Sequence, residues 1–212
     1  MSKSFFALLL VPAGLFAQDL KPVALPAPQT SGGKPLMQAL KERHSTREFS
    51  TEKLSPQVLS NLLWAGWGIN REDGRRTAPS ASNRQEIEIY AVMADGAYLY
   101  DAQANALKPV TRSDLRKLAG TQPYPADAPL NLIYVADTAK LGGDDAARLA
   151  TANADTGFIA QNVYLFCASE GLGTVVRGSV NRDDLGKALN LRAGQRIILA
   201  QTVGYAKKAA GN

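Results

Sequence analysis

The chain has one cysteine, Cys167, and one histidine, His44, among its 212 residues. A single cysteine excludes an intrachain disulfide, and this pair offers too few nitrogen and sulfur ligands for a typical zinc site. Cys167 lies among apolar residues in a helical pattern, so we interpret it as a small core residue rather than a nucleophile. No Ser/His/Asp triad or carboxylate pair is apparent either. The sequence therefore offers no candidates for thiol, triad or zinc catalysis.

The chain also lacks a long Lys/Arg run and any interleaving of basic with aromatic residues. A nucleic-acid partner is therefore not indicated. The net charge is +5, and it becomes +4 if Lys3 is removed with the segment that contains it. This mild excess of positive charge favours an anionic cofactor. The length and the apolar fraction of 45% fit one globular domain with a sizeable core.

No apolar run is long enough to span a bilayer as a stable helix. The run Phe5 to Val11 follows a basic residue and is broken by Pro12 and Gly14, and Ala17 offers a small residue for cleavage. This layout predicts a signal peptide over residues 1–17, with a retained N-terminal anchor as the alternative. We expect the mature chain to be exported, to a periplasm or to the outside, with no membrane attachment after cleavage.

Residues 18–35 are rich in proline and glycine and read as a linker or N-terminal arm, and residues 36–212 form the predicted domain. Hydrophobic periodicity and capping residues predict its elements. The helices are expected near 36–40, 55–67, 112–119 and 144–170, and Asn181 is expected to cap a last helix. The strands are expected near 86–93, 97–100, 106–110, 130–136, 174–180 and 196–203, with a loop over 123–129. This order predicts a single domain with an α+β fold.

The most distinctive polar stretch is Arg43-His44-Ser45-Thr46-Arg47, between the first two predicted helices. Arg43, Ser45 and Arg47 alternate, so an extended segment would turn all three to the same side. Planar guanidinium forks and a hydroxyl suit a phosphate or a carbonyl-rich ring edge. A solvated basic surface is the alternative interpretation of this stretch alone.

Four stretches, in this order, resemble motifs of the FMN-dependent nitroreductase superfamily. They are residues 43–47, Pro79-Ser80-Ala81-Ser82-Asn83, residues 171–178 with the turn Gly171-Leu172-Gly173, and residues 199–205 with a final Gly-Tyr. Residues 63–66 and 74–80 are also similar to the branch that contains SagB-like, peptide-oxidising dehydrogenases. The resemblance covers residues 36–205, nearly all of the predicted mature chain.

The resemblance implies a mixed central sheet flanked by helices, in an intertwined homodimer. This dimer would bind FMN at its interface, where both subunits contact each cofactor. Arg43 and Ser45 would hold the phosphate and the ribityl chain, His44 would contact the same region, and Arg47 would face the pyrimidine edge of the ring. Negative charge gathers at that edge on reduction, and a fixed guanidinium stabilises it. The loop with Pro79, Ser80, Ala81 and Asn83 would line the ring from the second subunit. Backbone N–H groups near Arg177 and Gly178 would face the reacting edge, since glycine lets the backbone come close.

The activity implied is hydride transfer from a reductant such as NAD(P)H to an organic acceptor, nitroaromatic or quinone-like, by a ping-pong mechanism. NAD(P)H is scarce outside the cytoplasm, which gives weight to a SagB-like dehydrogenase or oxidase of a small molecule or peptide. A non-catalytic flavin-binding protein and an unrelated exported α+β binding domain are the further alternatives.

The chain departs from the family pattern at three places. Arg177 stands where many members have an acidic residue, which would favour anionic substrates. The family often has a basic pair well past the Gly-Tyr that reaches the phosphate, whereas this chain stops soon after Tyr205. Lys207 or Lys208 could take that role, and a solvated tail is the alternative interpretation. Asp155 lies where some members place a flavin-contacting amide, and it is a weaker candidate for that role.

Overall fold

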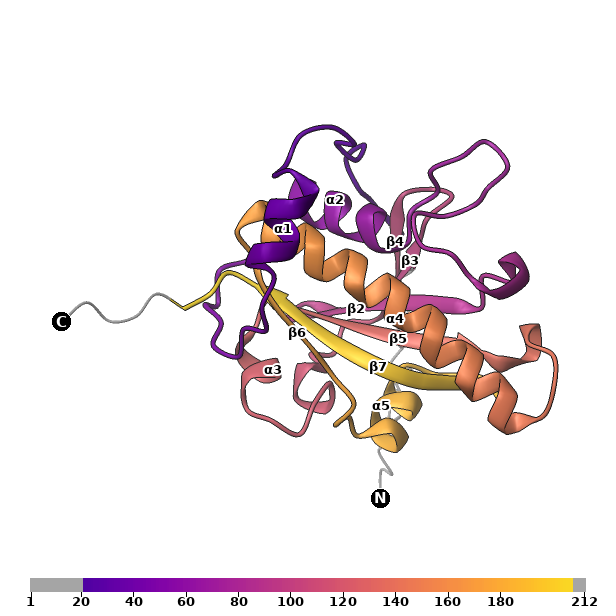
Figure 1. Ribbon diagram of the computed structural model, residues 1–212. Coiled ribbons are helices and arrows are strands. Elements are labelled where there is room, and N and C mark those ends of the chain that lie inside the picture. Colours follow the sequence, from indigo (N-terminus) through magenta and orange to yellow (C-terminus); the bar gives the residue numbers. More distant parts are fainter. Residues whose placement is uncertain (1–20, 208–212) are drawn as a thin grey trace, which may run out of the picture.

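The computed structural model describes residues 21–207 and folds them around one β-sheet (Figure 1). The predicted signal peptide and its cleavage site lie outside these residues. The helices are α1 Leu36–Glu42, α2 Pro56–Trp67, α3 Tyr124–Asp127, α4 Asp145–Glu170 and α5 Arg182–Ala188, with short 3₁₀ helices at Ala81–Asn83, Arg116–Leu118 and Thr138–Lys140. The strands are β1 Val23–Ala24, β2 Ile87–Met93, β3 Gly96–Asp101, β4 Ala106–Thr111, β5 Leu130–Asp137, β6 Gly173–Arg177 and β7 Gln195–Gly204.

The seven strands have the order β1-β4-β3-β2-β5-β7-β6. Every pairing between neighbouring strands of the described chain is antiparallel. The predicted α+β class and the central sheet flanked by helices are confirmed, and the sheet is antiparallel throughout rather than a mixture of orientations. β5 is buried along its whole length, as its continuous apolar run predicted.

Helices cover both faces of the sheet, which makes three layers. α2 and α4 lie on one face, where they pack against alternate residues of β2 and β5 such as Ile89 and Leu132. α5 lies on the other face, and its Leu185 packs against Ile133 and Val135 of β5. In Figure 1, α4 runs diagonally across the sheet while α5 lies below β7. Because β5 contributes to both cores, it is the centre of the fold.

Capping residues fix the two longer helices where the sequence predicted. Ser55 accepts a hydrogen bond from the Val58 N–H at 3.2 Å, and Pro56 occupies the first turn of α2. Asp144 caps α4 in the same way by accepting from the Ala147 N–H at 2.9 Å. α4 ends at Gly171, which has a φ of 72°, a left-handed conformation that glycine adopts without strain.

Two local predictions were wrong. The helix expected over 112–119 is only a 3₁₀ turn, because the Asp114 carboxylate accepts from both the backbone and the side chain of Arg116 and closes a tight turn. The expected loop 123–129 contains the short helix α3. The N-terminal arm also contributes a strand, since Val23 and Ala24 pair with β4.

Arg177, at the end of β6, points its side chain into the protein. Its guanidinium donates to the Ala119 carbonyl at 2.7 Å, to Asn131 Oδ1 at 2.8 Å and to Thr202 Oγ1. Burial lowers the pKa of Arg177 to about 10, so the group stays charged at neutral pH. The side chain is 6% exposed. The guanidinium is therefore not free to attract an anionic substrate, and that expectation is corrected.

We predict that Arg177→Met lowers the free energy of unfolding by about 2–4 kcal/mol, because buried acceptors lose their donor. Urea denaturation with an intrinsic fluorescence readout measures the loss. The matched control is Arg112→Met, since Arg112 is exposed, and its effect should stay within about 0.5 kcal/mol. Equal unfolding midpoints for the two variants would contradict a structural role for the Arg177 side chain.

Candidate functional site

Residues 43–47 are held in place along the edge of the sheet formed by β6. The Thr46 N–H donates to the Thr174 carbonyl at 2.9 Å. Just beyond, Phe49 pairs with Ala206 and the Lys207 N–H donates to the Glu48 carbonyl at 3.0 Å. The segment is therefore fixed from two sides, by β6 and by the residues that follow β7.

Tyr164 of α4 joins this segment to β6. Its hydroxyl lies 2.9 Å from Ser45 Oγ and accepts from the Val176 N–H at 3.0 Å. The Arg43 guanidinium lies over the Tyr164 ring, 5.1 Å from its centroid. The sequence interpretation missed Tyr164. Its only signal was a polar aromatic residue between Val163 and Leu165, in the apolar second half of the helix.

The segment carries positive charge that no acidic side chain neutralises. Within residues 21–207, neither Arg43 nor Arg47 forms an ion pair. Arg47 and Ser45 are exposed and Arg43 is half-buried. His44 is exposed too, and its Nδ1 lies 2.8 Å from the Glu42 carbonyl. This combination leaves guanidinium groups and a hydroxyl available to an anion.

Gly178 follows the last residue of β6 and leaves open space beside the backbone. A Cβ added there would meet only the Leu199 side chain, at 4.0 Å. Its φ is not in the left-handed region that favours glycine. Neither conformation nor packing within the described chain requires glycine here, which is compatible with close approach of a ligand to this backbone.

The second predicted set, residues 79–83, forms a tight turn before β2. Ser82 and Asn83 both have a φ of 52°, and Ser80 Oγ accepts from the Gln85 N–H at 3.1 Å. The Ala81 N–H donates to Asp155 Oδ2 on α4 at 2.8 Å. Pro79, Ala81 and Asn83 are exposed. The turn therefore presents an open surface while its backbone is held on α4.

The two sets lie apart within one subunit. Residues 43–47 contact α4 at Tyr164, and residues 79–83 contact it at Asp155. Nine residues of helix separate these positions by about 14 Å along the axis. No hydrogen bond between described residues joins the two sets. One subunit therefore does not gather all predicted residues around a single point.

The remaining candidates are placed as follows. Lys207 is exposed beside residues 47–49, and Lys208 lies outside the described residues. Asp155 is only 3% exposed and holds the Ala81 backbone, so it does not face open space as a direct ligand contact would require. Cys167 is buried, and burial raises the pKa of its thiol, in agreement with a core role.

Other site types have no counterpart in the described part of the chain. Residues 21–207 contain no group of three or more His, Cys, Asp or Glu side chains arranged to hold a metal ion. No helix among them combines the length and the apolar character that crossing a bilayer requires.

Comparison with known proteins supports the motif resemblance. The model of the nitroreductase family matches residues 40–205. A nitroreductase-family protein of Methanocaldococcus jannaschii is 31% identical over 170 residues, which are 74% of this chain and 85% of that protein. A crystal structure of such a protein from Ralstonia eutropha JMP134 is 39% identical with a TM-score of 0.84, covering 89% of this chain and 90% of the other.

A more distant structure shares the fold. The NADPH:FMN oxidoreductase of Vibrio harveyi, complexed with NAD⁺, has a TM-score of 0.62 at 20% identity and covers 82% of this chain and 69% of its own. The family match spans most of the chain, and the motifs that first suggested it lie inside the matched range. The chain therefore belongs to the nitroreductase family and is an oxidoreductase of that family.

Proposed function

We propose that the protein is an exported, homodimeric FMN oxidoreductase. In this proposal it transfers hydride from a reductant such as NAD(P)H to an organic acceptor, nitroaromatic or quinone-like, in a ping-pong cycle. The observation that carries the proposal is the unneutralised pair Arg43 and Arg47 on a segment fixed by β6 and Tyr164. Such a segment is suited to an anionic, carbonyl-rich cofactor.

The residues present fit FMN. Arg43 and Ser45 would bind its phosphate and ribityl chain, with His44 in the same region, and Arg47 would donate to the pyrimidine edge of the ring. The backbone beside Gly178 offers uncrowded space for the reacting edge. FMN, when bound, supplies the hydride chemistry, and the protein binds, orients and stabilises charge. This division of roles agrees with the lack of an acid–base triad.

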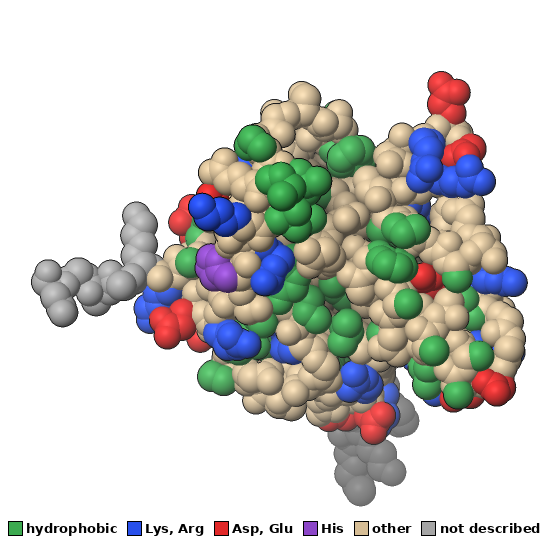
Figure 2. Space-filling model, viewed as in Figure 1, with side chains coloured by type: hydrophobic (Ala, Val, Ile, Leu, Met, Phe, Trp, Pro, Cys, Tyr) green, Lys and Arg blue, Asp and Glu red, His purple; other side chains and the backbone are tan. Residues whose placement is uncertain are grey.

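The exposed faces of α1 and α4 support the proposed homodimer. The outward face of α4 consists largely of small residues, with Phe158 at 49% exposure among them. α1 adds Leu36 and Met37, exposed by 62% and 75%. Figure 2 shows hydrophobic side chains exposed over these helices, with Lys and Arg side chains around them. Small residues let a second helix approach closely, and large exposed apolar residues favour burial.

A dimer would also resolve the separation of the two predicted sets. Residues 79–83 and 43–47 contact α4 about 14 Å apart along its axis within one subunit. If α4 packs against its copy, the turn of the second subunit can reach the arginine segment of the first. Pro79, Ser80, Ala81 and Asn83 would then line the cofactor from across the interface.

We predict that the purified full chain binds one FMN per subunit, and that Arg43→Ala and Arg47→Ala each raise the FMN Kd about 10- to 100-fold. The loss of a charge-assisted hydrogen bond of about 1.5–3 kcal/mol gives this range. Fluorescence quenching of FMN measures Kd. Anaerobic stopped-flow mixing then tests the reductant, because rapid bleaching by NAD(P)H supports the reductase and slow bleaching favours a SagB-like oxidase.

The matched control for these variants is Arg75→Ala. Arg75 is exposed and pairs with Asp73, and it is not among the residues predicted to contact FMN. Its FMN Kd should stay within twofold of the unmodified protein. A colourless protein that takes up no added FMN would refute the proposed cofactor.

We predict that Phe158→Asp converts the dimer into monomers and weakens FMN binding with it, because a charge would be buried at the helix seam. Sedimentation velocity reports the mass. Val23→Asp is the control, since Val23 is equally apolar and 47% exposed but lies on β1, at the far edge of the sheet. A Phe158→Asp protein that stays dimeric would place the interface elsewhere.

We predict that the mature protein begins at Gln18 when the full chain is expressed in a Gram-negative host. Cleavage after Ala17 follows from the charged start, the short apolar run and the small residue at the end of residues 1–17. Fractionation and intact-mass measurement test it. An uncleaved chain that stays with the cytoplasmic fraction would contradict export.

A further inference from the structure

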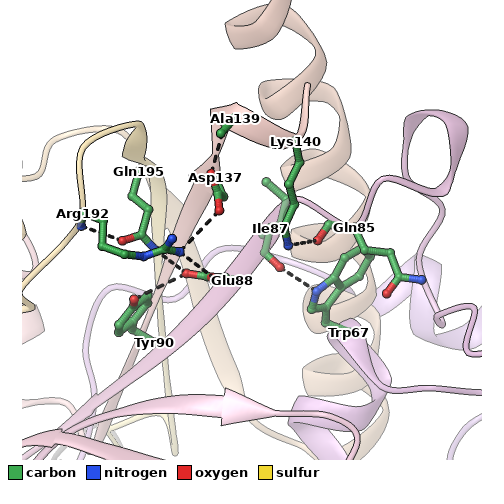
Figure 3. A network of polar contacts seen from close by, with 10 residues as sticks. All are labelled: Trp67, Gln85, Ile87, Glu88, Tyr90, Asp137, Ala139, Lys140, Arg192 and Gln195. Atoms are coloured by element: carbon green, nitrogen blue, oxygen red, sulfur yellow. Dashed lines mark hydrogen bonds and ion pairs between the residues drawn. The ribbon is translucent and has the colours of Figure 1, made fainter. Parts of the chain in front are cut away.

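Glu86 is a buried acid without a partner. Its side chain is 0% exposed just before β2, and neither carboxyl oxygen has a hydrogen-bond partner among the described residues. Glu88, two residues later, contrasts with it. Glu88 accepts from Gln195 and lies 3.7 Å from an Arg192 nitrogen in the network of Figure 3. Burying an unpaired carboxylate costs free energy, so Glu86 needs a proton or a counterion.

Asp155, which holds the turn before β2, is the acidic side chain whose charge acts on Glu86. Asp155 lies on α4, is 3% exposed and accepts from the Ala81 N–H through Oδ2 at 2.8 Å. Asp155 lies close enough to Glu86 to raise the pKa of the Glu86 carboxyl group. Two buried carboxylates side by side repel each other unless one of them carries a proton.

Few cations are available to this pair. Lys140, in the 3₁₀ helix after β5, acts on Glu86 from a distance, but its Nζ donates to the Gln85 carbonyl at 3.1 Å (Figure 3). Arg148 lies on the same face of α4, two turns before Asp155, and its Nε is buried without a partner among the described residues. Neither cation forms an ion pair with Glu86 or Asp155 within residues 21–207.

We propose that Glu86 and Asp155 share one proton, and that this proton positions residues 79–83 on α4. A protonated Glu86 would donate to Asp155, and Asp155 would keep its other oxygen on the Ala81 N–H. Loss of the proton would leave two negative charges side by side. Their repulsion would disturb Asp155, whose single hydrogen bond from the Ala81 N–H holds the turn. Glu86 is thus a positioning residue that acts on the turn through Asp155.

Burial raises the pKa of Glu86 to about 7, and the charge of Asp155 adds to the rise. The ordinary pKa of a glutamate is about 4.3 in an unfolded chain. Because the pKa of Glu86 is higher in the folded protein than in the unfolded chain, the bound proton stabilises the folded protein fully at pH values below the unfolded-chain pKa. This stabilisation declines as pH rises and is lost above pH 7. The turn should therefore be held firmly at pH 6 and loosely at pH 8.

This inference rests on the proposed function only for its effect on cofactor binding, because residues 79–83 are proposed to line FMN. The test therefore begins without cofactor. Hydrogen exchange is measured on the intact protein and read from the peptide that covers residues 78–86. After correction for the intrinsic pH dependence of exchange, the protection factor of this segment should fall about tenfold between pH 6 and pH 8. A tenfold change corresponds to one pKa unit of interaction.

Glu86→Gln keeps a hydrogen-bond donor and removes the charge, so its protection should be the same at both pH values. Glu52→Gln is the control, since Glu52 is exposed and its loss should leave the pH dependence of the wild type intact. If Glu86→Gln does not fold, Asp155→Asn replaces it. The new amide can donate to Glu86 while its oxygen accepts from Ala81.

The FMN Kd of the wild type should rise about tenfold over the same pH range, and that of Glu86→Gln should stay constant. Exchange that is independent of pH in the wild type, or equally dependent in Glu86→Gln, would overturn the shared proton. The expected exchange pattern in a protein that binds no FMN would support the pair and refute the proposed cofactor instead.

Discussion

The packing of α4 across the sheet is the constraint on which the rest of the site depends. One face of α4 buries Ile159 and Val163 against the sheet and α2, where Gly66 lets the helices approach so closely that a Cβ would lie 3.0 Å from Val163. This packing fixes the rotation of α4 about its axis. The same rotation presents Tyr164 to the arginine segment and Asp155 to the turn before β2. A shift of α4 would therefore move both predicted cofactor contacts together.

The same rotation decides what remains exposed. Once the apolar stripe of α4 faces the sheet, its small residues and Phe158 face outward. A long helix with a face of small residues has little to gain from solvent and much to gain from a second helix. The core packing of one subunit thus determines which face of α4 is exposed. We propose that this face forms the dimer interface, where the proposed site would lie.

Much of the fold could be predicted because its signals are local. Ser55-Pro56 and Asp144 mark helix starts through side chains that bond three residues away, and the apolar run of β5 reports burial on both faces. The helix expected over 112–119 failed for a local reason too, since Asp114 competes for the backbone of Arg116. Local sequence signals thus predict individual helices and strands, and they fail where a side chain forms a competing hydrogen bond with the backbone.

The contacts in the site that sequence reasoning could not predict join residues that are far apart in the chain. Tyr164 and Ser45 are 119 residues apart, and Asp155 and Ala81 are 74 residues apart. No spacing rule connects such pairs, because only the packed position of α4 brings them together. The motifs indicated which loops matter, whereas the residues that hold those loops became visible only with the tertiary structure.

Burial, more than residue type, decides what each arginine can do. Arg177, Arg43 and Arg47 all lie near β6, and the sequence pattern suggested ligand contacts for each. Arg177 is enclosed by the carbonyl of Ala119 and the side chain of Asn131, so its donors are used inside the chain. Arg43 and Arg47 lie on a segment outside the sheet, where no carboxylate neutralises them among the described residues. The internal arginine therefore has a structural role, and only the two outer arginines remain as proposed ligand contacts.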